Sequence, residues 1–336
     1  MDFLFSFGTC RVVGHLANSG AFLMLLGLSA CRPAALGPSV AGGHDSASAG
    51  GTYVREGDIA TYTSIPWGFS TNSYVIEGPT GLIAVDTQFL PSAAEELIQR
   101  AEAATKKNFV LAIVLHANPD KFNGTATFQK HGVRVITSAQ VKSVMAEVHA
   151  KRLRAFYDRY RPDYPKELPT PEVFGDVSTQ IEAGGVTLKL HVLGAGCSEA
   201  HVVVQHRHSV FVGDLVANRA HSWLEIGKTD AWLSRLSEIR AMSPTVVYAG
   251  RGGSGPARLL DDEEAYLRKV MAIVATEVET QGKANDDADS DEATLRAENA
   301  IKSAYPDYRY PVFLKIGLPA EFARQRKLRI PPLIQP

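Results

Sequence analysis

The sequence predicts an α/β protein in which layered β-sheets are covered by helices. Short apolar segments rich in β-branched residues alternate with amphipathic segments, and Gly- and Pro-rich turns separate the neighbouring apolar segments. The 336 residues are 45% hydrophobic and 21% charged, which is typical of a globular protein that can bury a large core. Lys and Arg (35) nearly balance Asp and Glu (36), so we expect no nucleic-acid partner.

The first 52 residues are predicted to be a targeting segment and a tether. The apolar run 21–28 is too short to span a bilayer, and it leads into Leu28-Ser29-Ala30-Cys31. This arrangement resembles a bacterial lipoprotein signal, so we expect a signal peptide over 1–31 and a lipid on Cys31. An ordinary signal peptide cleaved nearby and a buried core helix remain as alternatives. Residues 32–52 are rich in Ala, Gly, Ser and Pro and predict a flexible tether.

Export would leave one thiol in the folded domain, which we place at 53–336 with a helical extension at its C-terminal end. The chain has three cysteines, too few for a disulfide scaffold or a Cys-rich zinc module. Cys10 would be removed with the signal and Cys31 acylated, so Cys197 would be unable to form an internal disulfide. We therefore expect an exported, periplasmic protein that contacts the membrane only through the lipid on Cys31.

Within the domain, periodicity predicts the individual elements. Strands are expected at 59–65, 73–77, 81–86, 109–115, 133–137, 186–193, 201–205, 209–212 and 245–248. Helices are expected at 91–107, 125–130, 139–160, 230–240 and 261–279. Ser92 is placed to cap the first of these helices, with Glu95 three residues further on.

Four loops with polar residues follow predicted strands, where binding residues are usually mounted. They span 115–124 (LHANPDKFNG), 194–201 (GAGCSEAH), 212–215 (VGDL) and 249–253 (AGRGG). Their order and spacing resemble the metallo-β-lactamase fold family, in particular its exported hydrolase branch. The resemblance implies a four-layer αββα sandwich and, in the family, a hydrolase with two zinc ions.

The first loop departs from the family pattern at two positions. The family has HxHxDH, in which the His residues and the Asp bind zinc. This chain has His116, Asn118, Asp120 and Lys121 at the corresponding positions. The first His and the Asp are therefore kept, whereas an amide and an ammonium group replace the other two His residues.

The remaining loops keep only one family ligand. Cys197 stands where the family has a His after the glycine, and Arg251 replaces the His of a GHG motif. Asp214 keeps the position of the bridging carboxylate. Because ammonium and guanidinium groups have no lone pair to give at neutral pH, Lys121 and Arg251 are excluded as zinc ligands.

Charge balance suggests what replaces the metal. Asp120 and Asp214 are expected to be buried, and an unpaired buried carboxylate is costly. Lys121 and Arg251 supply two positive charges against these two negative ones, and Arg binds carboxylates bidentately. We therefore predict a neutral salt-bridge cluster in the place of the dinuclear zinc centre.

Three functional hypotheses follow. The first is a periplasmic binding protein without a cofactor, whose cleft holds a small polar or anionic ligand. The second is a hydrolase with one zinc, for which His116, Asp120, Cys197 and Asp214 are the candidate ligands. The third is an enzyme with Cys197 as nucleophile, activated by His116 or His201. In the enzymatic hypotheses Asp120 and Cys197 are the candidate catalytic residues; alternatively, His201 makes only a supporting hydrogen bond.

Four aromatic residues are candidates for the edge of the cleft: Trp67, Phe69, His221 and Trp223. Trp67 and Phe69 lie beside Pro66 and Gly68, where the family has a mobile hairpin. Packing within exposed loops explains these residues equally well.

Overall fold

The computed structural model describes residues 50–284 and 290–329 of the 336-residue chain. The predicted signal peptide at 1–31 and all but the end of the predicted tether at 32–52 lie outside the described residues. Within the described residues, the first strand starts at Thr52, one residue before the predicted start of the domain. None of the helices in the described part of the chain is long and apolar enough to cross a membrane.

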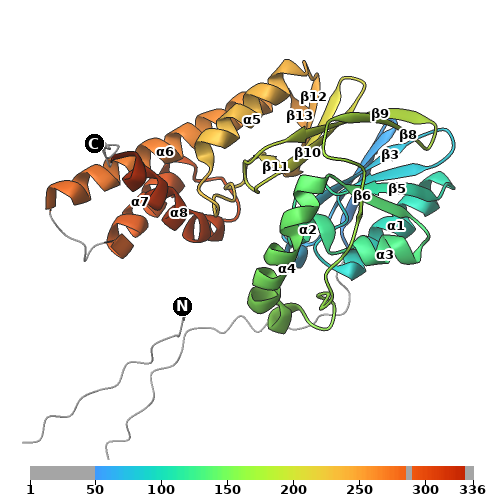
Figure 1. Ribbon diagram of the computed structural model, residues 1–336, viewed down its shortest axis with the longest axis horizontal. Coiled ribbons are helices and arrows are strands. Elements are labelled where there is room, and N and C mark those ends of the chain that lie inside the picture. Colours follow the sequence, from blue (N-terminus) through green and yellow to red (C-terminus); the bar gives the residue numbers. More distant parts are fainter. Residues whose placement is uncertain (1–49, 285–289, 330–336) are drawn as a thin grey trace, which may run out of the picture. The chain divides into compact units, whose positions relative to one another are not determined.

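Two β-sheets form the centre of the structure (Figure 1). The first has seven strands in chain order, antiparallel from β1 to β4 and parallel from β4 to β7. The second has six strands in the order β13-β12-β11-β10-β9-β8, with only β11 and β12 parallel. The strands are β1 Thr52–Glu56, β2 Ile59–Thr63, β3 Asn72–Glu77, β4 Leu82–Val85, β5 Phe109–Ile113, β6 Arg134–Thr137, β7 Glu172–Val173, β8 Thr179–Ala183, β9 Val186–Leu193, β10 His201–His206, β11 Ser209–Ala217, β12 Val246–Arg251 and β13 Gly255–Pro256.

Helices cover the outer faces of both sheets. They are α1 Pro91–Thr105, α2 Pro119–Phe122, α3 Thr125–Lys130, α4 Ala139–Tyr160, α5 Thr229–Ala241, α6 Arg258–Ala284, α7 Ser290–Ala304 and α8 Val312–Arg329, with a 3₁₀ turn at Pro66–Gly68. Leu97 and Ile98 of α1 are buried in one core with the first sheet, and Trp232 and Leu236 of α5 in another with β11 and β12. The layers are therefore helix, sheet, sheet and helix, as the sequence predicts.

The two sheets face each other through aromatic side chains. The ring of Tyr74 on β3 lies 5.3 Å from that of Phe211 on β11 and 5.0 Å from that of Tyr248 on β12. Phe211 and Tyr248 stack on each other at 4.6 Å. These contacts hold the ends of β3, β11 and β12 close together, where the polar residues of the predicted loops emerge.

Strand β11 differs from the prediction in a way that matters for the site. It was expected to end at residue 212, but it continues to Ala217 through a register shift at Gly213. Gly213 has a φ of 55°, which glycine adopts without strain. Because β11 continues past Gly213, Asp214 lies inside the strand and not in a loop. The β-bulge at Gly213 changes the direction of the side chain that follows it, which is that of Asp214.

The predicted helix cap at Ser92 is wrong. Helix α1 begins at Pro91, no side chain caps it, and Ser92 lies inside its first turn. The Ser92 hydroxyl donates a hydrogen bond to Asp163, whereas Glu95 lies 2.8 Å from the His131 ring. Pro91 at the first position of α1 has no backbone N–H that would need a hydrogen-bond acceptor, so the helix depends less on a capping side chain.

The chain continues beyond the second sheet with a helical extension. Of its three helices only α6 was predicted, as 261–279. Figure 1 shows α7 and α8 packed beside α6. Their buried residues join Val270 and Val274 of α6 in the second core; these residues are Ala293, Ala297, Ile301, Leu314, Leu318 and Phe322.

Gly124 offers a test of the packing beneath the first polar loop. A Cβ at this position would overlap the carbonyl oxygen of Thr87 and the side chain of Ala94, so Gly124→Ala should lower the free energy of unfolding by about 2 kcal/mol. Gly253→Ala is the control, because a Cβ there would approach only the Asn218 amide, at 3.8 Å. Urea unfolding of both variants measures the difference, and equal stabilities would contradict this packing.

Candidate functional site

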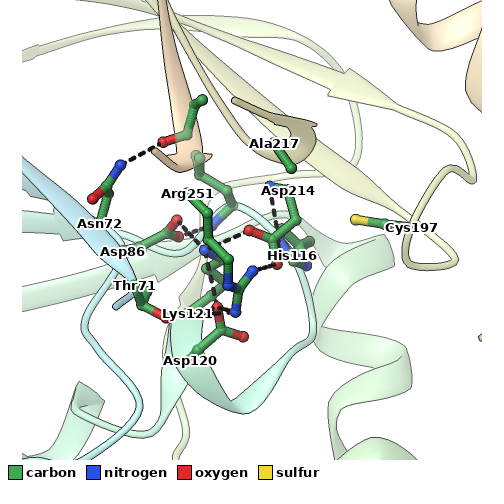
Figure 2. A network of polar contacts seen from close by, with 12 residues as sticks. Thr71, Asn72, Asp86, His116, Asp120, Lys121, Cys197, Asp214, Ala217 and Arg251 are labelled. Carbon is green, nitrogen blue, oxygen red and sulfur yellow. Dashed lines mark hydrogen bonds and ion pairs between the residues drawn. The ribbon is translucent and has the colours of Figure 1, made fainter. Parts of the chain in front are cut away.

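Lys121 lies at the centre of the polar loops and is completely buried. It belongs to the short helix α2, which follows the end of β5. Its Nζ atom lies 2.9 Å from Asp214 Oδ1, 3.0 Å from Asp120 Oδ2 and 3.9 Å from Asp86 Oδ2. Figure 2 shows this side chain among the three carboxylates. One ammonium group therefore links residues from three separate loops and strands.

Arg251 provides the second cation and enters from the end of β12. Its Nη1 donates to Asp214 Oδ2 at 2.6 Å and its Nη2 to Asp120 Oδ2 at 2.8 Å. The guanidinium group thus connects the two carboxylates, as Figure 2 shows. The four side chains for which the sequence predicts a charge cluster are brought together in one buried network.

The pKa directions agree with this pairing. Burial alone would raise the pKa of Asp120 and Asp214, but Lys121 and Arg251 outweigh it and hold both below the ordinary value. Burial would likewise lower the pKa of Lys121 and Arg251, and the neighbouring carboxylates raise it instead. All four groups therefore stay ionised at neutral pH.

Sequence reasoning missed Asp86 as a member of the cluster. Its Oδ1 accepts the Leu115 N–H at 2.9 Å, and burial raises its pKa to about 8. At neutral pH Asp86 is therefore mainly protonated and adds no charge to the cluster of Asp120, Asp214, Lys121 and Arg251. A signal was present in the sequence, because Asp86 ends the apolar segment GLIAVD, and a carboxylate placed there is expected to be buried.

Neighbouring polar groups hold the end of β12 in place. The Asn72 amide donates to the carbonyl oxygens of Ala249 at 3.1 Å and Gly252 at 2.7 Å, on either side of Arg251. The Thr71 hydroxyl donates to Asp120 Oδ2 at 3.3 Å. The Asn72 bonds tie the end of β12 to the start of β3, and the Thr71 bond ties the residue before β3 to α2, so the backbone around Arg251 and Asp120 is held in place.

A second buried group consists of His116, Cys197 and His201. One potential ligand atom of each lies within 4.8 Å of the others. Cys197 Sγ is 3.8 Å from His201 Nε2, and the rings of His116 and His201 are 5.0 Å apart. Burial lowers the pKa of His116 to about 4, holds that of His201 well below its usual value, and raises the pKa of Cys197. The imidazoles are therefore neutral and the thiol is protonated.

The charge cluster and the group of His116, Cys197 and His201 differ in how well they could bind zinc. The Asp120 and Asp214 carboxylates are already bound by Lys121 and Arg251, whose cations would repel a metal ion. His116, Cys197 and His201 offer two imidazoles and a sulfur, a donor set that suits zinc. In this structure the Nε2 atoms of His201 and His116 accept the backbone N–H groups of Ser198 and Asp214.

A hollow lies directly above the charge cluster. It is a shallow, half-open hollow with a free volume of only about 30 Å³, and it is lined by Phe69, Phe89, Asn118, Pro119, Asp120, Arg152, Phe156, Asp214, Trp223, Arg251 and Phe313. Of the four predicted edge residues, Phe69 and Trp223 line it, whereas Trp67 and His221 do not. His221 Nδ1 instead lies 2.9 Å from the Tyr266 hydroxyl.

Fold and loop positions agree with one protein family. The sequence profile of the metallo-beta-lactamase superfamily matches residues 66–251, more than half of the chain. The chain therefore belongs to the metallo-β-lactamase superfamily. It is 22% identical over 200 residues to a metallo-beta-lactamase type 2 of Bacillus cereus, covering 56% of this chain and 70% of that protein.

Solved structures support the same fold. A metallo-beta-lactamase from Pontibacter korlensis superposes with a TM-score of 0.53 at 20% identity, over 65% of this chain and 99% of its own. The metallo-beta-lactamase FIM-1 from Pseudomonas aeruginosa, in its mono-zinc form, gives a TM-score of 0.51 at 17% identity over 66% and 96%. At this identity the similarity shows the fold alone.

Replacing Lys121 tests whether the cluster stabilises the fold. Lys121→Met leaves buried carboxylates without compensation, and we expect it to lower the free energy of unfolding by about 3–5 kcal/mol. Lys151→Met removes an exposed partner of Glu225 and should cost less than about 1 kcal/mol. Chemical denaturation measures both, and a Lys121→Met protein as stable as the Lys151→Met control would show that the pairing is unimportant.

The Asp86 pKa predicts a pH dependence. The pKa of Asp86 is about 8 in the folded state and about 4 in the unfolded state, so its protonated form stabilises the fold. This stabilisation is fully present below about pH 4 and is lost as the pH rises towards about 8. The non-titrating Asp86→Asn variant should therefore gain stability relative to the natural protein across this range, by up to about 1.4 kcal/mol per pH unit. Unfolding curves at several pH values measure this difference. A constant difference would mean that Asp86 is ionised throughout.

Proposed function

We propose that the chain is a binding protein on a metallo-β-lactamase fold, exported to the periplasm and anchored by a lipid on Cys31. The cleft above the charge cluster would hold a small polar or anionic ligand, without a metal cofactor. We expect neither β-lactam hydrolysis nor nucleic-acid binding. The family fold and the loop positions support the place of the cleft, and the residues within it support the loss of zinc chemistry.

One observation carries this proposal. Lys121 Nζ and the Arg251 guanidinium lie 2.6–3.0 Å from the oxygens of Asp120 and Asp214. These carboxylates keep family ligand positions, so cations of the protein itself neutralise the charges that a metal would otherwise neutralise. A hydrolase of this family depends on its metal to activate water. Because both carboxylates are ion-paired and their pKa values are lowered, they are also poor general bases.

A hydrolase with one metal is the second candidate, and the His116, Cys197 and His201 group favours it. The sequence suggested Asp214 as a third ligand, but Asp214 is held by Lys121 and Arg251, and His201 lies beside Cys197 instead. These three residues would bind one zinc through two nitrogens and a sulfur, and the metal would supply a bound water of lowered pKa. Binding would require the Cys197 proton to leave.

The structure gives less support to Cys197 as a nucleophile. Its side chain is 1% exposed, and burial raises its pKa. The thiolate is the reactive form, so a buried thiol of raised pKa is a poor nucleophile. His201 is neutral and 3.8 Å away, but its Nε2 already accepts the Ser198 N–H.

Metal content decides between the first two candidates. The purified mature protein is dialysed against excess zinc, then against metal-free buffer, and analysed for bound metal. We expect less than about 0.1 zinc per chain, because Lys121 and Arg251 already hold the two carboxylates, the His116 and His201 Nε2 atoms already accept backbone N–H groups, and burial keeps the Cys197 thiol protonated. One zinc per chain that is lost in Cys197→Ala and retained in Cys197→His would overturn the proposal and establish the one-metal site.

A further inference from the structure

We propose that this chain has a second binding site, for a small organic cation of the alkylammonium class, at Glu263, Tyr305 and Tyr308. The site shares no lining residue with the hollow above the charge cluster, and it does not depend on the binding function proposed for that hollow. Three features carry the proposal: a large pocket, a buried carboxylate without a cation, and two tyrosine rings beside that carboxylate.

The pocket lies between the end of β11, the first turns of α6 and the segment that joins α7 to α8. Its free volume is about 520 Å³, and it is half-open to solvent. This volume is in the range of small-molecule sites. The hollow above the charge cluster, by comparison, has a free volume of about 30 Å³. A small ligand therefore has room in the pocket beside α6.

Glu263 of α6 lines this pocket and is only 4% exposed. Its oxygens accept hydrogen bonds from the Ser222 hydroxyl at 2.6 Å and the Ala217 N–H at 3.0 Å. No Lys, Arg or His within the described part of the chain forms an ion pair with it. Each of the other buried carboxyl groups there lies beside a Lys or Arg nitrogen; these are Asp86, Asp120, Asp214, Glu298 and Glu321. Because a buried charge without an opposite charge is costly, a cationic ligand would supply what Glu263 lacks.

The acidic residues next to Glu263 in α6 already have cations. Asp261 and Glu264 bind Arg240 at 2.9 and 2.5 Å. Asp262 binds Arg258 at 3.4 Å. The guanidinium groups that line the pocket, those of Arg219 and Arg258, belong to exposed residues, where water and salt screen their charge. The uncompensated charge that is held away from water in this pocket is therefore negative.

Tyr305 and Tyr308 form the aromatic part of the lining. Their ring centroids are 4.7 Å apart, and Tyr308 stacks on the buried Tyr266 at 5.5 Å. Burial raises the pKa of Tyr305 and Tyr308, and the Glu263 carboxylate raises it further because it opposes a phenolate charge nearby. The faces of aromatic rings attract organic cations, most strongly when the cation is desolvated. A carboxylate beside two such rings therefore favours an alkylammonium group over a neutral or anionic one.

The site lies in the part of the chain beyond the family match. The match covers residues 66–251, whereas Glu263, Tyr305 and Tyr308 belong to the helical extension. The shared fold therefore does not account for this group of residues, and the site is a property of this chain.

Choline and its neutral isostere 3,3-dimethyl-1-butanol test the proposal, because the two molecules have the same shape and differ in charge. Each is titrated by isothermal calorimetry into the purified protein at pH 8. We expect choline to bind at least tenfold more tightly, since it alone supplies a positive charge to Glu263. Equal affinities, or no measurable binding of choline, would overturn the proposal.

The pH dependence of choline binding gives a second measurement. Burial raises the pKa of Glu263 to about 7, and its ionised form attracts the cation. The charge of choline is permanent, so we expect it to bind about tenfold more tightly at pH 8 than at pH 6. The other titratable or charged groups around Glu263 keep their charge in this range, because the tyrosine pKa values are raised, that of His221 is lowered to about 4, that of Asp214 is lowered, and guanidinium groups stay protonated. An affinity that does not change with pH would contradict a contact with Glu263.

Two variants locate the site. Glu263→Gln removes the charge but keeps an oxygen that can accept a hydrogen bond from Ser222 or Ala217. We expect it to weaken choline binding at least tenfold and to abolish the pH dependence. Tyr308→Leu should weaken choline binding about fivefold through the lost ring contact.

Matched controls are Glu298→Gln and Tyr157→Leu. Glu298 is buried but already bound to Lys302 at 3.1 Å, and Tyr157 lies on α4, so neither residue lines the pocket. Both controls should bind choline within about twofold of the natural protein. Thermal unfolding shows whether each variant is folded, and a folded Glu263→Gln protein with unchanged affinity would overturn the proposal. If Glu263→Gln does not fold, the comparison with the neutral isostere and the pH profile of the natural protein decide.

Discussion

The charge balance around Asp120 and Asp214 is the constraint on which the other features of the site depend. Carboxylates at these positions are 4–6% exposed, and such groups need a cation close by. In this chain Lys121 and Arg251 provide it from two different loops. Because both cations contact both carboxylates, the loops after β5 and β12 and the bulge in β11 are held by one network.

The fold explains how residues so far apart in the chain meet. The strand ends carry the polar residues to one edge of the sandwich, and the bulge at Gly213 turns Asp214 toward the cluster. Asn72 then fixes the backbone on both sides of Arg251. In this chain the strand ends of the superfamily fold hold a salt-bridge network, which illustrates why fold alone does not determine function.

The helical extension contributes a side chain to the surroundings of the charge cluster. Phe313 covers Arg251, and with Phe69, Phe89, Phe156 and Trp223 it makes the space above the cluster mainly aromatic. Apolar and aromatic side chains with a few polar groups are the usual lining of a small-molecule site.

The sequence by itself determined the layered α/β fold, most of the helices and strands between residues 59 and 279, and the pairing of Asp120 and Asp214 with Lys121 and Arg251. These features follow from local periodicity and from residue types at motif positions. Only the tertiary structure decided that Asp86 joins the cluster and that His201 lies beside Cys197. It also decided that Phe313 reaches Arg251 from α8, a helix of the predicted extension whose bounds the sequence did not indicate. Such contacts join residues separated by many positions in the chain. Their partners depend on how the strands and helices pack, which local sequence patterns do not contain.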